Sequence, residues 1–163
     1  AAALAVAPAG LDARQIAAGL RTFRAIPHRV EPVREVDGVL WINDSKSTNV
    51  ASTGVAIAAI GRPFVLLLGG RHKGEPYAGL AQPLRARCRA VVACGEAAPL
   101  IARDLGGQLQ VVRADSFAEV LDRARELARP GDAVLLSPAC SSFDMFKNYE
   151  ERGARFRAAV EAM

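Results

Sequence analysis

Three polar segments contain the residues best able to do chemistry. They read NDSKSTN at 43–49, GGRHKG at 69–74 and SPACSSFD at 137–144, and each directly follows a short apolar run. Together they offer two lysines, Lys46 and Lys73, with several hydroxyls and backbone N–H groups. Ammonium, hydroxyl and amide donors complement the oxygens of phosphates and carboxylates. The segments therefore predict a site for a small anionic ligand.

Each segment also has a purely structural interpretation. Residues 43–49 could be a polar loop in which Thr48 or Asn49 caps the following helix. Residues 69–74 could be a glycine turn, and the phosphate-loop pattern G-x-x-x-x-G-K-[S/T] occurs nowhere in the sequence. Cys140 has no accompanying histidine to activate its thiol, so a nucleophilic cysteine is not expected.

The elements that must position these segments are apolar runs alternating with amphipathic helices. Two extended runs flank Asp37-Gly38, a pair that favours a hairpin turn, and further strands are expected at 64–68, 90–94, 109–112 and 133–137. Helices are expected at 11–24, from about 50 to 61, at 77–87, after Gly95 to 105, at 116–128 and at 143–161. This pattern predicts a Rossmann-like, doubly wound α/β fold, with a mostly parallel sheet and an N-terminal β-hairpin as its antiparallel edge. Ligands bind at the carboxyl ends of such strands, where the polar segments fall.

Composition limits the classes of function. The chain has 163 residues with a formal net charge of +4, and three of its 21 basic residues are lysines, including Lys147. The charge is spread without a basic block, and no apolar stretch is long enough to span a bilayer, so neither a nucleic acid nor a membrane is an expected partner. Three cysteines without a Cys-x-x-Cys pair and two distant histidines, His28 and His72, indicate a cytoplasmic protein with no metal site. The chain begins with alanine in an alanine-rich stretch, as expected of a piece of a longer protein.

Taken together, the motifs resemble the carboxy-terminal domain of the Mur ligases, in particular the members that add D-glutamate. The matching stretches are PHR (27–29), WINDSKSTN (41–49), LLLGGRHKG (66–74) and LLSPACSSFDMFKNYEERG (135–153). They run in the family's order, and DSK-x-TN distinguishes these members from their relatives. Residues 26–163 resemble this Rossmann-like domain, and residues 1–25 resemble the tail end of the central ATPase domain that precedes it.

The resemblance implies an ATP-dependent ligase of peptidoglycan synthesis. ATP would phosphorylate the alanyl carboxylate of UDP-N-acetylmuramoyl-L-alanine, and the amine of D-glutamate would attack the acyl phosphate to form an amide. The family's phosphate loop and magnesium ligands lie upstream of this domain, so the cofactors would be ATP and magnesium and this chain alone would be inactive. A monomer is expected.

The resemblance also assigns roles to individual residues. Arg29 would contact the ATP phosphates, Asp44 the ribose hydroxyls, and Lys46, the catalytic residue, both ATP and the transferring phosphate. The D-glutamate site would comprise Thr48, Lys73, Ser142, Phe143 and Tyr149. Lys147 belongs to the motif without a role. Two alternatives stay open: another Mur or folylpolyglutamate-type amide ligase, and a non-catalytic anion-binding module of the same fold.

Overall fold

The fold is that of a computed structural model, which describes residues 10, 12–22 and 26–163. The strands are β1 (Glu31–Val36), β2 (Val39–Asn43), β3 (Phe64–Gly69), β4 (Cys88–Cys94), β5 (Val111–Ala114) and β6 (Ala133–Leu136). The helices are α2 (Ala13–Thr22), α3 (Val50–Ala59), the 3₁₀ turn η2 (Tyr77–Leu80), α4 (Ala81–Arg85), α5 (Ala98–Leu105), α6 (Phe117–Leu127) and α7 (Tyr149–Glu161). Parts of the helix expected at 11–24, and of the segment 1–25 as a whole, lie outside the described residues.

The six strands form one sheet in the order β1-β2-β6-β3-β4-β5. β1 and β2 are antiparallel, and every other neighbouring pair is parallel. Asp37 and Gly38 join β1 to β2 with φ values of 52° and 76°, the two positive angles that a type I′ turn requires. The predicted α/β fold with an antiparallel edge is confirmed.

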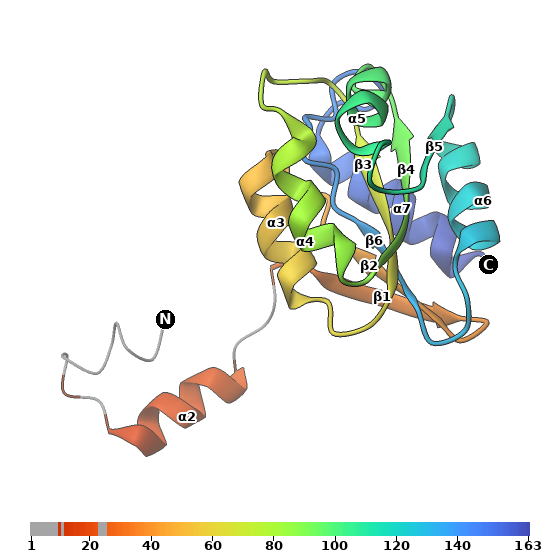
Figure 1. Cartoon of the computed structure of the whole chain (residues 1–163). Helices are drawn as coiled ribbons and strands as arrows, with labels where there is room; N and C mark the ends of the chain where they lie inside the picture. Colours follow the sequence, from red (N-terminus) through yellow and green to blue (C-terminus); the bar gives the residue numbers. More distant parts are fainter. Residues whose placement is uncertain (1–9, 11, 23–25) are drawn as a thin grey trace.

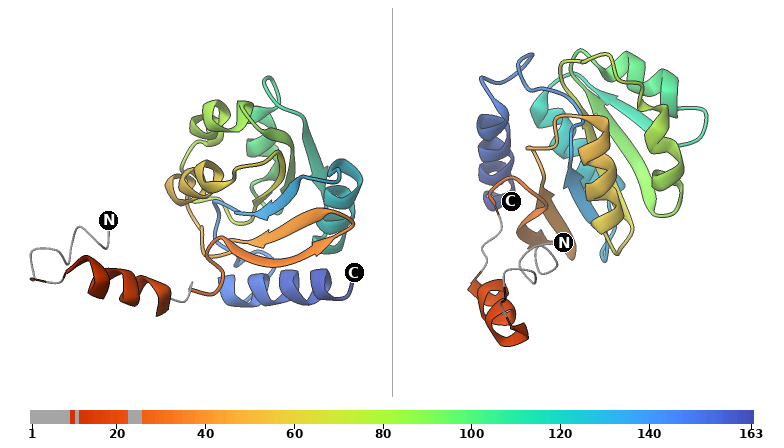
Figure 2. Two further views of the ribbon diagram at one scale, coloured as in Figure 1. Left: turned by 90° about the horizontal axis from the view of Figure 1, so that it is seen from below. Right: turned by 90° about the vertical axis from the view of Figure 1, so that its left-hand side faces the viewer.

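Helices cover both faces of the sheet, as a doubly wound fold requires (Figure 1). The side chains of the fully buried strand β3 alternate between the two faces. Leu66 and Leu68 pack in a cluster with α3, α4 and α5, whereas Val65 and Leu67 pack with α6 and α7. Helix α7 runs along the hairpin edge of the sheet (Figure 2). The body is therefore a three-layered sandwich whose strand ends carry the polar segments.

Three predicted boundaries were wrong. The helix expected at 77–87 is the 3₁₀ turn η2 followed by the five-residue α4, because Gly79 and Pro83 disfavour a continuous helix. The strand expected at 109–112 begins only at Val111, because the N–H of Leu109 bonds back to the carbonyl of Leu105, 3.0 Å away. The helix expected at 143–161 begins at Tyr149.

Helix α2 lies apart from the sandwich in all three views (Figures 1 and 2). None of its residues is buried, and Leu20 is 55% exposed. In the described part of the chain, no helix has the length and apolar character needed to cross a membrane.

Candidate functional site

The order of the strands brings the three polar segments together. β6 lies between β2 and β3, so the loops that leave these three strands are neighbours at one end of the sheet. Backbone hydrogen bonds join them: the Gly69 N–H donates to the Pro138 carbonyl at 3.0 Å, and the Ala139 N–H donates to the Ser47 carbonyl at 3.0 Å. The Arg71 N–H likewise donates to the Ser141 carbonyl at 2.9 Å. The predicted gathering at the carboxyl ends is thus found, with the third segment in the middle.

An open hollow of about 410 Å³ lies at this end of the sheet. It is lined by Thr48, Lys73, Ser141, Ser142, Phe143, Asn148, Tyr149 and Glu150. All five residues that the resemblance assigns to D-glutamate are in this lining, drawn from all three loops and the first turn of α7. We call it the loop hollow.

The lining combines the ammonium of Lys73 and the carboxylate of Glu150 with hydroxyls and an aromatic edge. Lys73 is exposed on its loop, and it forms no ion pair with any residue in the described ranges. Ser142 is only 2% exposed, whereas the ring of Phe143 is 62% exposed at the rim. An exposed aromatic ring beside an ammonium and hydroxyls suits a small ligand that carries carboxylates on a short carbon chain.

Lys46 lies next to the loop hollow and contacts its wall. Its Nζ donates a hydrogen bond to the hydroxyl of Tyr149 at 2.8 Å and lies 4.5 Å from the centre of that ring. The His28 ring meets the same tyrosine edge-on, with ring centres 6.1 Å apart. Two of the three ammonium protons of Lys46 remain for another acceptor.

The PHR turn is held in a strained conformation beside the same loops. His28 and Val30 have φ values of 63° and 44°, in the left-handed region that costs energy for residues other than glycine. Their backbone groups are tied to the loop after β2: the His28 carbonyl accepts from the Lys46 N–H at 3.0 Å, and the Val30 N–H donates to Asp44 Oδ1 at 3.1 Å. Arg29, between them, is exposed.

Asp44 is placed differently from the other predicted site residues. It is 1% exposed, and its second oxygen accepts from the Ser137 hydroxyl at 2.7 Å. Burial raises the pKa of this carboxyl, although the hydroxyls of Ser47 and Ser137 and the Val30 N–H lower it in part. As it stands, Asp44 cross-links the PHR turn and two loops and does not face the loop hollow.

Sequence reasoning missed several residues of this region. Asn148 lines the hollow and caps α7, since its Oδ1 accepts from the Glu151 N–H at 2.8 Å. The spacing Asn-x-x-Glu before a helix is a cap signal that could have located it. Arg152 is 2% exposed and its guanidinium bonds to Ser45 and to the Cys140 carbonyl. No pattern in the sequence marked this arginine as buried.

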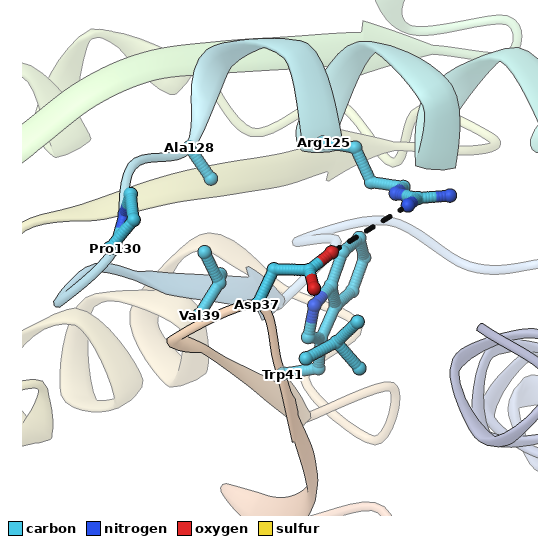
Figure 3. A pocket seen from close by; sticks show the side chains of 7 residues that line it. Asp37, Val39, Trp41, Arg125, Ala128 and Pro130 are labelled. Carbon is cyan, nitrogen blue, oxygen red and sulfur yellow. Dashed lines mark ion pairs between the residues drawn. The ribbon is translucent and has the colours of Figure 1, made fainter.

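A second hollow, of about 150 Å³, lies at the opposite end of the sheet beside the hairpin turn (Figure 3). Asp37 and Arg125 face each other across it at 3.8 Å, and Trp41 lies against its wall. None of the predicted site residues lines it. Within the described ranges, no three histidine, cysteine or acidic residues gather so that they could hold a metal ion.

The fold and the site together define a Rossmann-like α/β domain with a polar hollow at the carboxyl ends of its strands, and the sequence comparisons identify its family. Residues 28–140 match the family "Mur ligase, glutamate ligase domain". The chain belongs to this family. It is 50% identical over 145 residues to UDP-N-acetylmuramoylalanine--D-glutamate ligase of Salinibacter ruber, covering 88% of this chain and 32% of that protein. It is 45% identical to the same ligase of Myxococcus xanthus, covering 100% of this chain and 36% of that protein. The chain thus spans about a third of the length of these curated relatives.

Solved structures show the same fold at lower sequence identity. The MurF ligase from Thermotoga maritima in complex with ADP superposes with a TM-score of 0.61 at 17% identity, covering 98% of this chain and 36% of that one. The bifunctional folylpolyglutamate synthase/dihydrofolate synthase from Yersinia pestis gives a TM-score of 0.63 at 17% identity, covering 93% of this chain and 35% of that one.

Proposed function

We propose that this chain is the amino-acid-binding domain of an ATP-dependent ligase that adds D-glutamate to UDP-N-acetylmuramoyl-L-alanine in peptidoglycan synthesis. One observation carries the proposal: Thr48, Lys73 and Ser142, with the rings of Phe143 and Tyr149, line a single hollow. The relatives at 44–50% identity that are named D-glutamate ligases support it.

The loop hollow has the chemistry that D-glutamate requires. The substrate carries two carboxylates, and Lys73 with the hydroxyls of Thr48 and Ser142 would receive them through charge-assisted hydrogen bonds. Phe143 and Tyr149 would enclose the carbon chain and hold the amine towards the reacting carboxyl.

The proposed reaction passes through an acyl phosphate. ATP phosphorylates the alanyl carboxylate with release of ADP, the amine of D-glutamate attacks the acyl carbon, and phosphate leaves as the amide forms. We assign Arg29 to the ATP phosphates and Lys46 to the transferring phosphoryl group, where an ammonium stabilises developing negative charge. Magnesium, held by residues outside this chain, would neutralise the phosphates of ATP.

The ribose role of Asp44 depends on the family resemblance. Both of its oxygens accept hydrogen bonds inside the domain, from the Val30 N–H and the Ser137 hydroxyl. Binding of ribose hydroxyls would therefore require that Asp44 exchange at least one of these partners or use a remaining lone pair.

We also propose that residues 1–25 are the tail end of a preceding ATPase domain and that the domain described above begins at residue 26. The amphipathic α2, which buries none of its side chains here, supports this division. The complete ligase would act as a monomer in the cytoplasm, where its small-molecule substrates are found, without nucleic acid or membrane.

The test is a substrate comparison with the longer protein that contains this chain. Amide formation and ADP release are measured with D-glutamate, L-glutamate and L-lysine in the presence of UDP-N-acetylmuramoyl-L-alanine. We expect D-glutamate alone to give product. A preference for another amino acid would favour a different Mur or folylpolyglutamate-type ligase, and release of no ADP with any of them would favour a non-catalytic anion-binding module.

The chain alone should be inactive. It contains no G-x-x-x-x-G-K-[S/T] sequence, so nothing in its 163 residues offers the usual cradle for the phosphates of ATP. We expect no ADP release above background from the purified 163-residue chain with all three substrates. D-glutamate-dependent ADP release from this chain would contradict the proposal that it is inactive without the rest of the ligase.

A further inference from the structure

Cys140, which the proposed reaction does not use, lies buried at the centre of the three loops. It is fully buried, and its Sγ lies 2.9 Å from the hydroxyl of Tyr77, which is itself 1% exposed. The Tyr77 hydroxyl also lies 3.0 Å from Nδ1 of His72, and the two rings pack with their centres 5.5 Å apart. A hydrogen-bonded chain therefore leads from His72, beside Lys73, to Cys140, two residues before Ser142.

The protonation states of the two buried groups favour this chain. Burial, followed by the bond to Cys140, raises the pKa of the Tyr77 hydroxyl. Burial also raises the pKa of the Cys140 thiol, although its bond to Tyr77 and the charge of Arg152 lower it in part. Both groups keep their protons at neutral pH. With His72 Nδ1 as the acceptor, the thiol donates to the hydroxyl and the hydroxyl donates to the ring, so each proton is used once.

Cys140 is fixed at its backbone as well. The Arg152 guanidinium donates to the Cys140 carbonyl at 3.2 Å from one nitrogen and 3.3 Å from another, and to the Ser45 carbonyl at 2.9 Å. On the other side, the backbone at Gly70 is so close that a Cβ there would lie 2.3 Å from the Ser141 carbonyl oxygen. Contacts on both sides thus fix the loop that carries Ser142. The position of Lys73 relative to Ser142 then depends on the loop that carries Lys73.

We propose that the His72–Tyr77–Cys140 chain positions Lys73 opposite Ser142 across the loop hollow, which makes His72 and Tyr77 positioning residues for D-glutamate. The loop from Gly70 to Pro76 is anchored towards its two ends: the Gly70 N–H bonds to the Cys94 carbonyl, the Arg71 N–H bonds to the Ser141 carbonyl, Arg71 pairs with Glu96, and the Glu75 carboxylate accepts from the Val50 N–H at 3.0 Å. Lys73 lies between these anchors, and the His72 ring is the neighbouring contact that restrains it. This inference rests on the proposed function.

A double-mutant cycle in the longer ligase tests the chain. Tyr77→Phe keeps the ring and removes the hydroxyl, and we expect it to raise the KM for D-glutamate about three- to tenfold, the effect of losing one net hydrogen bond, with little change in kcat or in the KM for ATP. Cys140→Ala should have a similar effect, and Cys140→Ser, which keeps a donor, should restore a KM near that of the wild type. Because both changes break the same chain, the double variant should be no worse than either single one. Effects that multiply, or an unchanged KM in Tyr77→Phe, would overturn the inference.

Hydrogen exchange of the 163-residue chain gives an independent readout. In Tyr77→Phe, the Arg71 amide, which bonds across the loops to Ser141, should exchange about three- to tenfold faster. Arg89→Gln is the matched control, because it breaks the ion pair with the buried Asp132 at the opposite end of the sheet and should leave Arg71 exchange unchanged. If the Arg71 amide exchanged equally faster in both variants, Tyr77 would act only as a general core residue and would not restrain this loop specifically. If the wild-type ligase does not use D-glutamate, the proposed function fails, while this exchange result still decides whether the chain restrains the loop.

Discussion

Lys73 is the residue on which substrate affinity should depend most. It is the lysine of the loop hollow, and a hydrogen bond from an ammonium to a carboxylate contributes about 1.5–3 kcal/mol. In the longer ligase, Lys73→Ala should therefore raise the KM for D-glutamate about 10- to 100-fold and leave the KM for ATP nearly unchanged. Lys147→Ala is the matched control, since Lys147 is exposed and outside the lining. Steady-state kinetics would contradict the assignment if the two variants behaved alike.

Asp44 should make the chain more stable, relative to an Asp44→Asn variant, as the pH falls. Its pKa is raised from the ordinary value of 3.8, chiefly by burial. The folded state then takes up a proton more readily than the unfolded state, so the stabilisation is complete below the unfolded pKa and is lost as the pH rises through the folded pKa. Urea unfolding at pH 7, 5 and 4 should show the free-energy difference between wild type and Asp44→Asn growing in favour of the wild type.

Asp132, at the other end of the sheet, should show the opposite pH dependence when the same urea experiment is extended to pH 3. Burial alone would raise its pKa, but its bond with the Arg89 guanidinium and the Arg129 N–H, 2.9 Å away, lower the pKa below 3.8. Its stabilisation is present above the unfolded pKa and is lost as the pH falls through the folded pKa. The advantage over Asp132→Asn should shrink below pH 4. If both aspartates gave the same sign, the assignment for Asp44 would be wrong.

Helix α7 contains a glycine, Gly153, at a position where the neighbouring His28 ring leaves no room for a side chain. A Cβ at Gly153 would lie 2.2 Å from Nδ1 of His28, the strained residue of the PHR turn. Glycine to alanine in a helix normally stabilises by about 0.5–1 kcal/mol, but overpacking at a buried contact costs about 1–3 kcal/mol. Gly153→Ala should therefore lower the free energy of unfolding, as measured in urea.

The control for this prediction lies in α2. A Cβ at Gly19 would meet no atom of the described residues within 4 Å, so Gly19→Ala should follow helix propensity alone and raise the helical signal in circular dichroism without loss of stability. If Gly153→Ala were as stable as Gly19→Ala, close approach of His28 would not be the reason for the glycine.

The start of α7 illustrates what hydrophobic spacing can and cannot predict. Phe143, Phe146 and Tyr149 recur every three residues, a spacing that suits a helix, and Phe146 is buried at 7% exposure. The prediction of one continuous helix was wrong, because the Ser142 carbonyl accepts from the Phe146 N–H at 2.8 Å in an isolated turn and Asn148 then adopts an extended backbone that begins a new helix. A single turn and a helix share the same spacing, so periodicity alone could not separate them.

At the scale of the whole molecule, some features of the strand arrangement could be predicted from the sequence and others could not. Strand identities, the hairpin and the placement of polar loops at carboxyl ends followed from apolar runs and turn residues. The position of β6 between β2 and β3 could not be predicted, because an apolar run records burial and not which strand lies beside it. That order is what brings Ser142 between Thr48 and Lys73 in one lining. The burial of Asp44 and Arg152 escaped prediction for a similar reason, since charged residues are buried only where distant partners meet them.

The proposed domain boundary makes a prediction about stability. In the described residues, α2 buries no side chain, and its amphipathic face, which includes Leu20 at 55% exposure, contributes nothing to the two cores of the sandwich. A chain of residues 26–163 should therefore unfold in urea with the same midpoint and slope as the 163-residue chain, within about 0.5 kcal/mol. The slope matters as well as the midpoint, because it scales with the surface exposed on unfolding and would fall if residues 1–25 packed on the domain. A lower midpoint with a smaller slope would show that residues 1–25 belong to the same cooperative unit, and the boundary would then have to be moved towards the N-terminus.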